Sequence, residues 1–383
     1  MPKAVQIGAG SIGRGFIGQL FYEGGYETTF VDADEGLVEN LKRAGRYPLH
    51  LVGVNCDDRL TIGNLTAISA FDAAKVTSAI DRAGIIATAA GVRALPAVAG
   101  SLAAGINERA RNSRGPIDIL LCENQWHAAA TVREMISPHI ADRARTYFEN
   151  GVGLVETVIG RMVPAAKPGS SPSDPLLVVA EPYKELPIDR RALRGPAPRL
   201  PGLIEADNFP AYEARKLLLH NMSHAALAYL GYQRGHEYIW QCAADAQVFE
   251  ECSSCIDEAS SALIREYHFD RAALHEFSAD LMARFTNKVL GDTVARVAAD
   301  PIRKLRGTDR LIGAAALCAK HGIAPRAISR VIDAALRYDN PDDPSAVELQ
   351  RLRNSLGDTA ALTQISGINP AEFLGKDDKA LPR

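Results

Sequence analysis

The stretch Val5-Gln6-Ile7-Gly8-Ala9-Gly10-Ser11-Ile12-Gly13-Arg14-Gly15 decides the fold, because it places a G-x-G-x-x-G pattern directly after a short apolar run. Gly8 permits a tight turn, Gly10 lets backbone amides approach a pyrophosphate, and Gly13 allows the following helix to pack closely on the strand. The N-terminus of that helix faces the anion. The expected cofactor-binding residues of this turn are Gly8, Gly10, Ser11, Ile12 and Gly13.

The residues that follow the turn favour NAD as the cofactor. Residues 28–31 predict a second strand, and Asp32 ends it about 20 residues beyond the glycines, where a carboxylate accepts hydrogen bonds from the adenosine ribose. The same carboxylate repels a 2′-phosphate, so NAD is preferred over NADP. A turn residue is the alternative role for Asp32. FAD is the alternative cofactor for the glycine turn, but no later segment suggests a flavin contact.

The first part of the chain alternates short β-rich runs with helical patterns, which is typical of βαβ units and a mainly parallel sheet. Residues 49–70 instead predict short antiparallel strands inserted into the sheet. The β-rich residues 151–159 and 176–188 are expected to extend it. The predicted strands of the alternating pattern are residues 3–7, 28–31, 84–87 and 117–121, and its first helices are residues 12–22 and 35–43.

The segment RRALRGPAPRLP, residues 190–201, marks the expected domain boundary, since its prolines sustain neither a helix nor a central strand. From residue 209 onward, one Ala- and Leu-rich amphipathic helix follows another. The fold class is therefore α/β, with an N-terminal Rossmann-type doubly wound sheet (residues 1–190) and a mainly α-helical C-terminal domain (residues 191–383).

Composition excludes several classes of partner. The net charge of −3 gives no field that attracts nucleic acid or an anionic membrane, and no apolar run reaches the roughly 20 residues of a membrane span. The chain enters a strand without a signal-peptide layout, so we expect a cytoplasmic protein that acts on small molecules. Its six cysteines are expected to be free thiols. Cys252-Ser253-Ser254-Cys255 has no second ligand pair, so no metal site is expected.

Three polar residues stand out at the start of the helical half, in Lys216-Leu-Leu-Leu-His-Asn221-Met-Ser-His224. On a continuous α-helix they fall within an arc of roughly 140° along about 12 Å, so they could line one cleft. A lysine whose pKa is lowered by burial can take the proton of a secondary alcohol as hydride leaves carbon, and an Asn amide can stabilise the developing oxyanion. A surface lysine and a core histidine on an amphipathic helix are the alternative.

Almost end to end, the chain resembles the polyol-specific long-chain dehydrogenase family, whose signature is Lys-x4-Asn-x2-His. The resemblance runs through GAGSIGRGFIG, Cys122-Glu-Asn124, KLLLHNMSHAALAYLG, Asp300-Pro-Ile-Arg-Lys304-Leu and the closing ALTQISGI. Chain length and the DPIRKL segment look most like the members that act on a sugar phosphate. This similarity implies NAD-dependent, metal-independent interconversion of mannitol 1-phosphate and fructose 6-phosphate by a monomer or homodimer.

The resemblance also implies roles for residues. Lys216 is the implied general base, Asn221 and Asn124 the oxyanion hole, and His224 the residue that orients substrate hydroxyls. Arg303 and Lys304 belong to a basic cluster that could bind a phosphate, although a solvated helix end explains it equally well.

Two positions depart from the family pattern. His127 stands where phosphate-specific members are expected to carry Arg, which makes His127 a candidate substrate-binding residue. The difference leaves an unphosphorylated polyol or hexonate as the alternative substrate. Gly160-Arg161 stands where the family usually has Asp-Arg, so the family's substrate-side contacts of that strand cannot be carried over to this chain. A remote alternative is a non-catalytic NAD(H)-sensing protein, but no effector surface is visible.

Overall fold

The computed structural model describes residues 1–123, 125–164 and 174–369. It divides into two compact units, Met1–Phe209 and Pro210–Arg383, and each is described by itself. None of the helices in the described part combines the length and the apolarity that crossing a bilayer requires.

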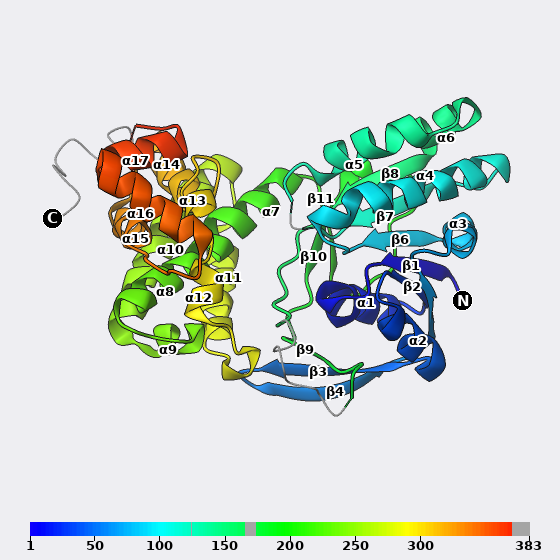
Figure 1. Cartoon of the computed structure of the whole chain (residues 1–383), viewed down its shortest axis with the longest axis horizontal. Helices are drawn as coiled ribbons and strands as arrows, with labels where there is room; N and C mark the ends of the chain where they lie inside the picture. The colour runs from blue at the N-terminus through cyan, green and yellow to red at the C-terminus, as the bar shows by residue number, and fades with distance from the viewer. Residues whose placement is uncertain (124, 165–173, 370–383) are drawn as a thin grey trace. The chain divides into compact units, whose positions relative to one another are not determined.

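The first unit is built on a six-stranded parallel sheet (Figure 1). Its order is β5-β2-β1-β6-β7-β8, which is the strand order of the doubly wound dinucleotide-binding fold. The predicted Rossmann-type domain is thereby confirmed. The strands are β1 (Lys3–Ile7), β2 (Glu27–Asp32), β5 (Leu65–Ser69), β6 (Ile85–Thr88), β7 (Ile117–Leu121) and β8 (Val152–Glu156).

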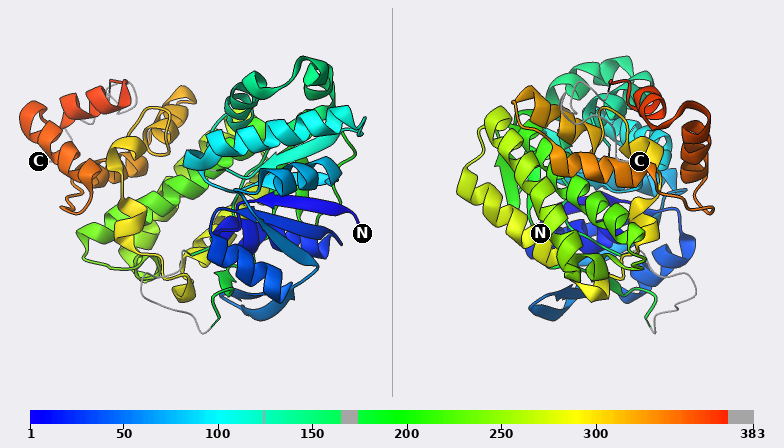
Figure 2. Two further views of the ribbon diagram at one scale, coloured as in Figure 1. Left: turned by 45° about the vertical axis from the view of Figure 1, so that its right-hand side comes forward. Right: turned by 90° about the vertical axis from the view of Figure 1, so that its left-hand side faces the viewer.

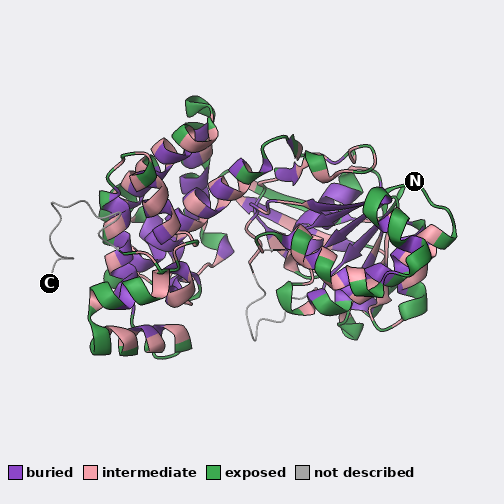
Figure 3. Ribbon diagram, turned by 90° about the horizontal axis from the view of Figure 1, so that it is seen from above, coloured by how far each residue is buried: buried purple, intermediate pink, exposed green. Residues whose placement is uncertain are grey.

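Helices cover both faces of this sheet because alternate strand residues point to opposite sides. On β1, Val5 and Ile7 pack in one apolar cluster with α3, α4 and α5, while Ala4 packs in another with α1. The inner strands β6 and β7 are therefore buried at every residue, and much of the sheet is purple in Figure 3, whereas the edge strand β5 is mostly only partly buried. The helices are α1 (Gly18–Glu23), α2 (Glu35–Ala44), α3 (Ala73–Arg82), α4 (Leu95–Arg111), α5 (Ala128–Ile136) and α6 (Arg145–Gly151).

The prediction of antiparallel strands inserted into the main sheet at residues 49–70 is wrong in part. β3 (Tyr47–Gly53) and β4 (Cys56–Ile62) are antiparallel, but they form a separate sheet with β9 (Val178–Ala180). β5 joins the main sheet parallel to β2. Parallel neighbours need a long crossover, and α2 together with the β3–β4 hairpin provides that connection.

The expected extension of the sheet is confirmed only for its first half. β8 pairs with β7, whereas β9 pairs with β3 and β10 (Leu186–Asp189) pairs with β11 (Leu203–Ala206). The proline-rich residues 190–201 lie between β10 and β11, which both belong to the first unit. The division into domains at residue 190 stays a prediction.

The second unit is mainly helical, as the sequence predicts (Figure 2). Its centre is α8, which is buried on nearly every side and packs against α10, α12 and α15. The helices are α7 (Phe209–Arg215), α8 (Met222–Gln233), α9 (Ile239–Ala244), α10 (Ala246–Tyr267), α11 (Arg271–Phe285), α12 (Val294–Ala298), α13 (Pro301–Lys304), α14 (Ile312–Lys320), α15 (Arg326–Leu336), α16 (Pro344–Leu356) and α17 (Asp358–Ser366).

Candidate functional site

The glycine turn after β1 has the geometry that a dinucleotide requires. Gly8 adopts φ 91°, and a Cβ there would lie 2.4 Å from the Ala89 carbonyl oxygen. A Cβ on Gly13 would lie 2.0 Å from the Gly8 oxygen, so both positions exclude a side chain. A Cβ on Gly10 would meet nothing within 4 Å, which leaves open space beside the turn for a pyrophosphate.

The helix that opens at this turn begins as a π-helix, η1 (Gly13–Ile17), where the sequence predicts an ordinary helix. Arg161 contacts this segment: it is 3% exposed and donates through Nη1 to the Gly15 carbonyl (2.9 Å) and to Gln19 Oε1 (2.7 Å). Its guanidinium also lies 4.7 Å from the centre of the Phe16 ring. Arg161 therefore supports the helix that follows the glycine turn. The effect of Gly160-Arg161 on substrate-side contacts stays a prediction.

Asp32 lies at the carboxyl end of β2, next to the glycine turn. Its Oδ2 accepts a hydrogen bond from the Ala9 amide (2.6 Å) and its Oδ1 accepts one from Asp34 (2.9 Å). Each carboxylate oxygen has a further lone pair for a ribose hydroxyl. The open space at Gly10 and this carboxylate together fit NAD, with Ser11 and Ile12 partly exposed between them.

The carboxyl end of β7 carries a buried carboxylate that holds the neighbouring loop. Glu123 is 7% exposed and accepts hydrogen bonds from the amides of Ala90 (3.0 Å) and Gly91 (2.9 Å). Asn124 lies outside the described residues. His127 is exposed, with φ 53°, directly before α5.

The predicted catalytic helix differs from a uniform α-helix. α7 and α8 are joined by a π-helical turn, η6 (Lys216–Asn221). Because a π-helix closes i→i+5 hydrogen bonds, its wider turn brings Asn221 nearer the face of Lys216 than α-helical spacing predicts. Turns of this kind occur frequently at functional sites.

Three of the predicted catalytic residues lie on this helical segment and remain partly accessible to solvent. Lys216, Asn221 and His224 are each partly exposed, whereas Leu219 and Met222 between them are fully buried. The buried residues fix the segment in the core of the second unit. Burial is the main cause that lowers the pKa of His224, and the charge of Lys216 adds a smaller effect in the same direction.

His224 is held by a carboxylate that the sequence analysis did not single out. Its Nε2 lies 3.0 Å from Asp292 Oδ2, and its ring stacks on Phe285 at 4.9 Å between centres. Burial lowers the pKa of His224, and Asp292 opposes that shift. Burial would raise the pKa of Asp292, but His224 and Arg296 outweigh it, so the pKa lies below its usual value. Asp292 and the Phe285 ring together fix the orientation of the His224 ring.

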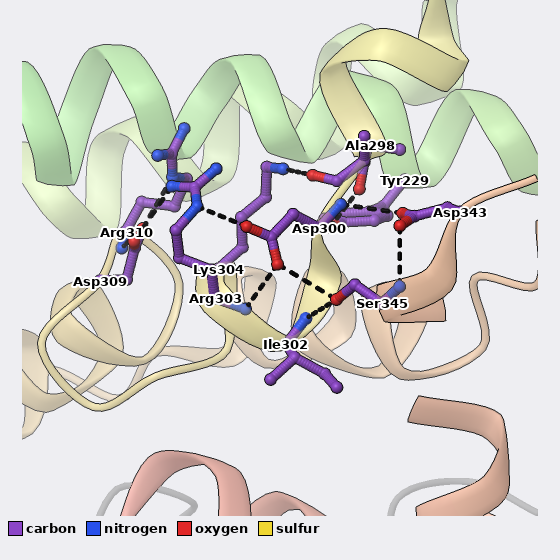
Figure 4. Close-up of polar contacts among 11 residues, drawn as sticks. Tyr229, Ala298, Asp300, Ile302, Arg303, Lys304, Asp309, Arg310, Asp343 and Ser345 are labelled. Carbon is purple, nitrogen blue, oxygen red and sulfur yellow. Dashed lines mark hydrogen bonds and ion pairs between the residues drawn. The ribbon is translucent and has the colours of Figure 1, made fainter. Parts of the chain in front are cut away.

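The predicted basic cluster is a network of internal ion pairs (Figure 4). Arg303 Nε lies 2.8 Å from Asp300 Oδ2 and its Nη1 lies 3.4 Å from Asp309 Oδ2. Arg310 Nε donates to Asp309 at 2.8 Å. Lys304 is 3% exposed and donates to the Ala299 carbonyl. Burial, with the charges of Arg310 and Arg303, lowers its pKa to about 7.

The cysteine pair lies where the sequence places it, on a helix. Cys252 and Cys255 are both buried in α10, and burial raises the pKa of each thiol. In the described residues, no three His, Cys, Asp or Glu side chains are grouped to hold a metal ion.

Comparison with known proteins assigns both halves of the chain. Residues 2–202 match the mannitol dehydrogenase Rossmann domain, and residues 208–376 match the mannitol dehydrogenase C-terminal domain. The chain belongs to the mannitol dehydrogenase family.

Similar members of the mannitol dehydrogenase family come from several bacteria. A mannitol-1-phosphate 5-dehydrogenase of Arthrobacter sp. (strain FB24) is 37% identical over 373 residues, covering 97% of this chain and 95% of its own. The Brevibacillus brevis mannitol-1-phosphate 5-dehydrogenase is 33% identical over 365 residues, which cover 95% of this chain and 93% of its own.

Two solved structures share the family fold. The Pseudomonas fluorescens mannitol 2-dehydrogenase, in a ternary complex with NAD and D-mannitol, has a TM-score of 0.73 at 17% identity and covers 98% of this chain and 88% of its own. A D-sorbitol dehydrogenase in substrate-free form has a TM-score of 0.76 at 16% identity, with coverage of 95% and 91%.

Three supporting roles in this mannitol dehydrogenase family chain were not predicted from the sequence. Asp292 orients His224, Glu123 holds the loop after β6, and Arg161 holds the cofactor helix. Glu123 was visible only as part of the Cys-Glu-Asn motif, and nothing near Asp292 in the sequence signals a histidine partner. The catalytic, cofactor and substrate roles of the predicted residues themselves stay predictions.

Proposed function

We propose that this chain catalyses the NAD-dependent interconversion of mannitol 1-phosphate and fructose 6-phosphate. The observation that carries the proposal is the 32–37% identity to bacterial mannitol-1-phosphate 5-dehydrogenases over at least 95% of the chain. A full-length match includes both the cofactor-binding unit and the helical unit that would provide the catalytic lysine.

Each predicted residue has a defined task in this reaction. NAD, when bound, exchanges a hydride with the carbon of the substrate. Lys216 takes the hydroxyl proton in the oxidative direction and returns it to the oxygen in the reductive direction. Asn221 and Asn124 donate hydrogen bonds to the developing oxyanion. His224, oriented by Asp292, binds a neighbouring hydroxyl group.

The proposed phosphate contacts are Arg303 and Lys304. Arg303 is half-exposed, so a phosphate can approach it but would compete with the carboxylates of Asp300 and Asp309. Lys304 is 3% exposed and donates to the Ala299 carbonyl, so its contact with a phosphate would require that side chain to move. His127, in place of the Arg expected of phosphate-specific members, favours the second candidate, an unphosphorylated polyol or hexonate.

A substrate screen separates the two candidates. NADH oxidation, followed by its absorbance, is measured with fructose 6-phosphate, fructose, tagaturonate and fructuronate. We expect kcat/KM to be highest for fructose 6-phosphate. An equal or higher value for fructose or a hexuronate would overturn the phosphate proposal in favour of the second candidate.

We further propose that the enzyme works in the cytoplasm as a monomer or homodimer. Its six cysteines are free thiols, the form that a reducing compartment maintains. Size-exclusion chromatography with light scattering measures the oligomeric state, and a tetramer or larger assembly would contradict this proposal.

A further inference from the structure

One of the most exposed apolar side chains of the first unit stands beside the cofactor site. Phe71 is 75% exposed, in the turn between β5 and α3. Scattered exposed apolar residues are ordinary on protein surfaces and need no explanation by themselves. The position of Phe71, rather than its exposure alone, carries the inference.

The backbone fixes Phe71 next to the ribose-binding carboxylate. β5 pairs with β2 so that Ser69 lies opposite Asp32, and the Ala70 amide donates to the Asp32 carbonyl at 2.8 Å. The Phe71 amide donates to Ser69 Oγ at 3.1 Å, and that hydroxyl donates to Glu35. Phe71 is therefore exposed but anchored, two residues beyond the strand partner of Asp32.

The order of the strands matches the order of the groups in the cofactor. The glycine turn that faces the pyrophosphate follows β1, the carboxylate that faces the adenosine ribose ends β2, and β5 is the next strand outward and the edge of the sheet. Neighbouring strands are about 4.8 Å apart. The group that follows the ribose along the cofactor is the adenine base, so it extends toward the end of β5.

We propose that Phe71 is the aromatic platform on which the adenine ring of NAD stacks. A flat apolar side chain at this place offers an exposed face on which the π system of the adenine can stack. The proposal depends on dinucleotide binding and not on the identity of the polyol, so it can fail or succeed independently of the substrate screen.

The experiment compares cofactors that do and do not contain the adenosine half. Kd values for NADH and for reduced nicotinamide mononucleotide are measured by isothermal titration calorimetry with the wild type, Phe71→Ala and Phe71→Trp. We expect Phe71→Ala to raise Kd for NADH about 5- to 150-fold, the effect of losing one base–aromatic stack. Affinity for the mononucleotide should not change, and Phe71→Trp should restore NADH affinity.

Phe249→Ala is the matched control, because Phe249 is an exposed phenylalanine (40%) on α10 in the second unit. It should leave both Kd values at wild-type levels. The proposal is overturned if Phe71→Ala leaves Kd for NADH unchanged, or if it raises Kd for the mononucleotide to the same extent. A change of oligomeric state in Phe71→Ala with unaltered Kd would also overturn it and would assign the side chain to contact with a second copy of the chain.

Discussion

Replacing Asp292 by Asn tests whether the carboxylate orients His224 for the reaction. The two side chains are only 12% and 15% exposed, so solvent screens their interaction weakly. A hydrogen bond to a charged group contributes about 1.5–3 kcal/mol, and about 1.4 kcal/mol corresponds to a tenfold change in rate. We therefore expect kcat/KM for fructose 6-phosphate to fall about 10- to 100-fold, while Kd for NADH stays unchanged.

The chain contains a closely matched control. His236 Nε2 lies 2.9 Å from Asp245 Oδ2, and Arg234 Nε binds the same carboxylate at 2.6 Å. Beside His224, Arg296 Nε on α12 likewise lies 2.6 Å from Asp292 Oδ1. Asp245→Asn thus perturbs a His–Asp–Arg group of the same composition at a different place in the second unit.

Steady-state kinetics with fructose 6-phosphate and NADH, together with urea unfolding, distinguish the two variants. Asp245→Asn should change the unfolding midpoint and leave kcat/KM per folded molecule at the wild-type level. The reasoning is refuted if the two variants lose equal activity, or if Asp292→Asn retains more than half of the wild-type kcat/KM.

Four further predictions address the remaining groups. Lys216→Ala should lower kcat by at least about 10³-fold with unchanged NADH affinity, and retention of more than about a tenth of the turnover would contradict its role as general base. Asp32→Ala should raise Kd for NAD and reduce the preference over NADP, and a wild type that already prefers NADP would refute the assignment. Arg303→Ala should raise KM for fructose 6-phosphate about tenfold without affecting fructose, since Arg303 is half-exposed and a charged contact there is partly screened; equal effects on both substrates would count against a phosphate contact. Lys304→Met should remove the contribution of this lysine to the pH dependence of the free energy of unfolding. Burial lowers the pKa of Lys304 from 10.5 in the unfolded chain to about 7 in the native state, so between pH 7 and 10.5 the lysine is protonated only in the unfolded chain. The wild type should therefore gain stability relative to the variant as pH rises from 7, by up to about 1.4 kcal/mol per unit, and a constant difference in urea unfolding would refute the buried-lysine argument.

The parts of the site that could be predicted from the sequence depend on local geometry. Gly8 is required by the positive φ of the turn, and Gly13 by its close approach to the Gly8 oxygen in the same turn, so a short motif identifies both. Asp32 follows from the length of one βαβ unit. The parallel sheet and the helical second unit also follow from periodicity, which is a property of neighbouring residues.

The parts that could not be predicted depend on contacts between distant segments. Arg161 binds Gly15 and Gln19, and Asp292 binds His224, although neither partner lies near in the sequence. The β3–β4 hairpin has the sequence pattern of two antiparallel strands, but it pairs with a third strand, residues 178–180, and forms a separate sheet. Hydrophobic periodicity specifies which residues are buried and does not specify which strand they pair with.

The cofactor site assigns two tasks to one carboxylate, and this limits how its specificity can change. Asp32 accepts a hydrogen bond from the Ala9 amide inside the glycine turn, and its predicted role is to accept one from a ribose hydroxyl as well. A replacement without an acceptor, such as Ala, removes the charge that repels a 2′-phosphate but also leaves the Ala9 amide without its partner, which loosens the turn. A neutral acceptor such as Asn removes the charge and can still accept from the Ala9 amide. A change toward NADP is therefore expected to keep the turn intact when Asp32 is replaced by a neutral acceptor rather than by an apolar side chain.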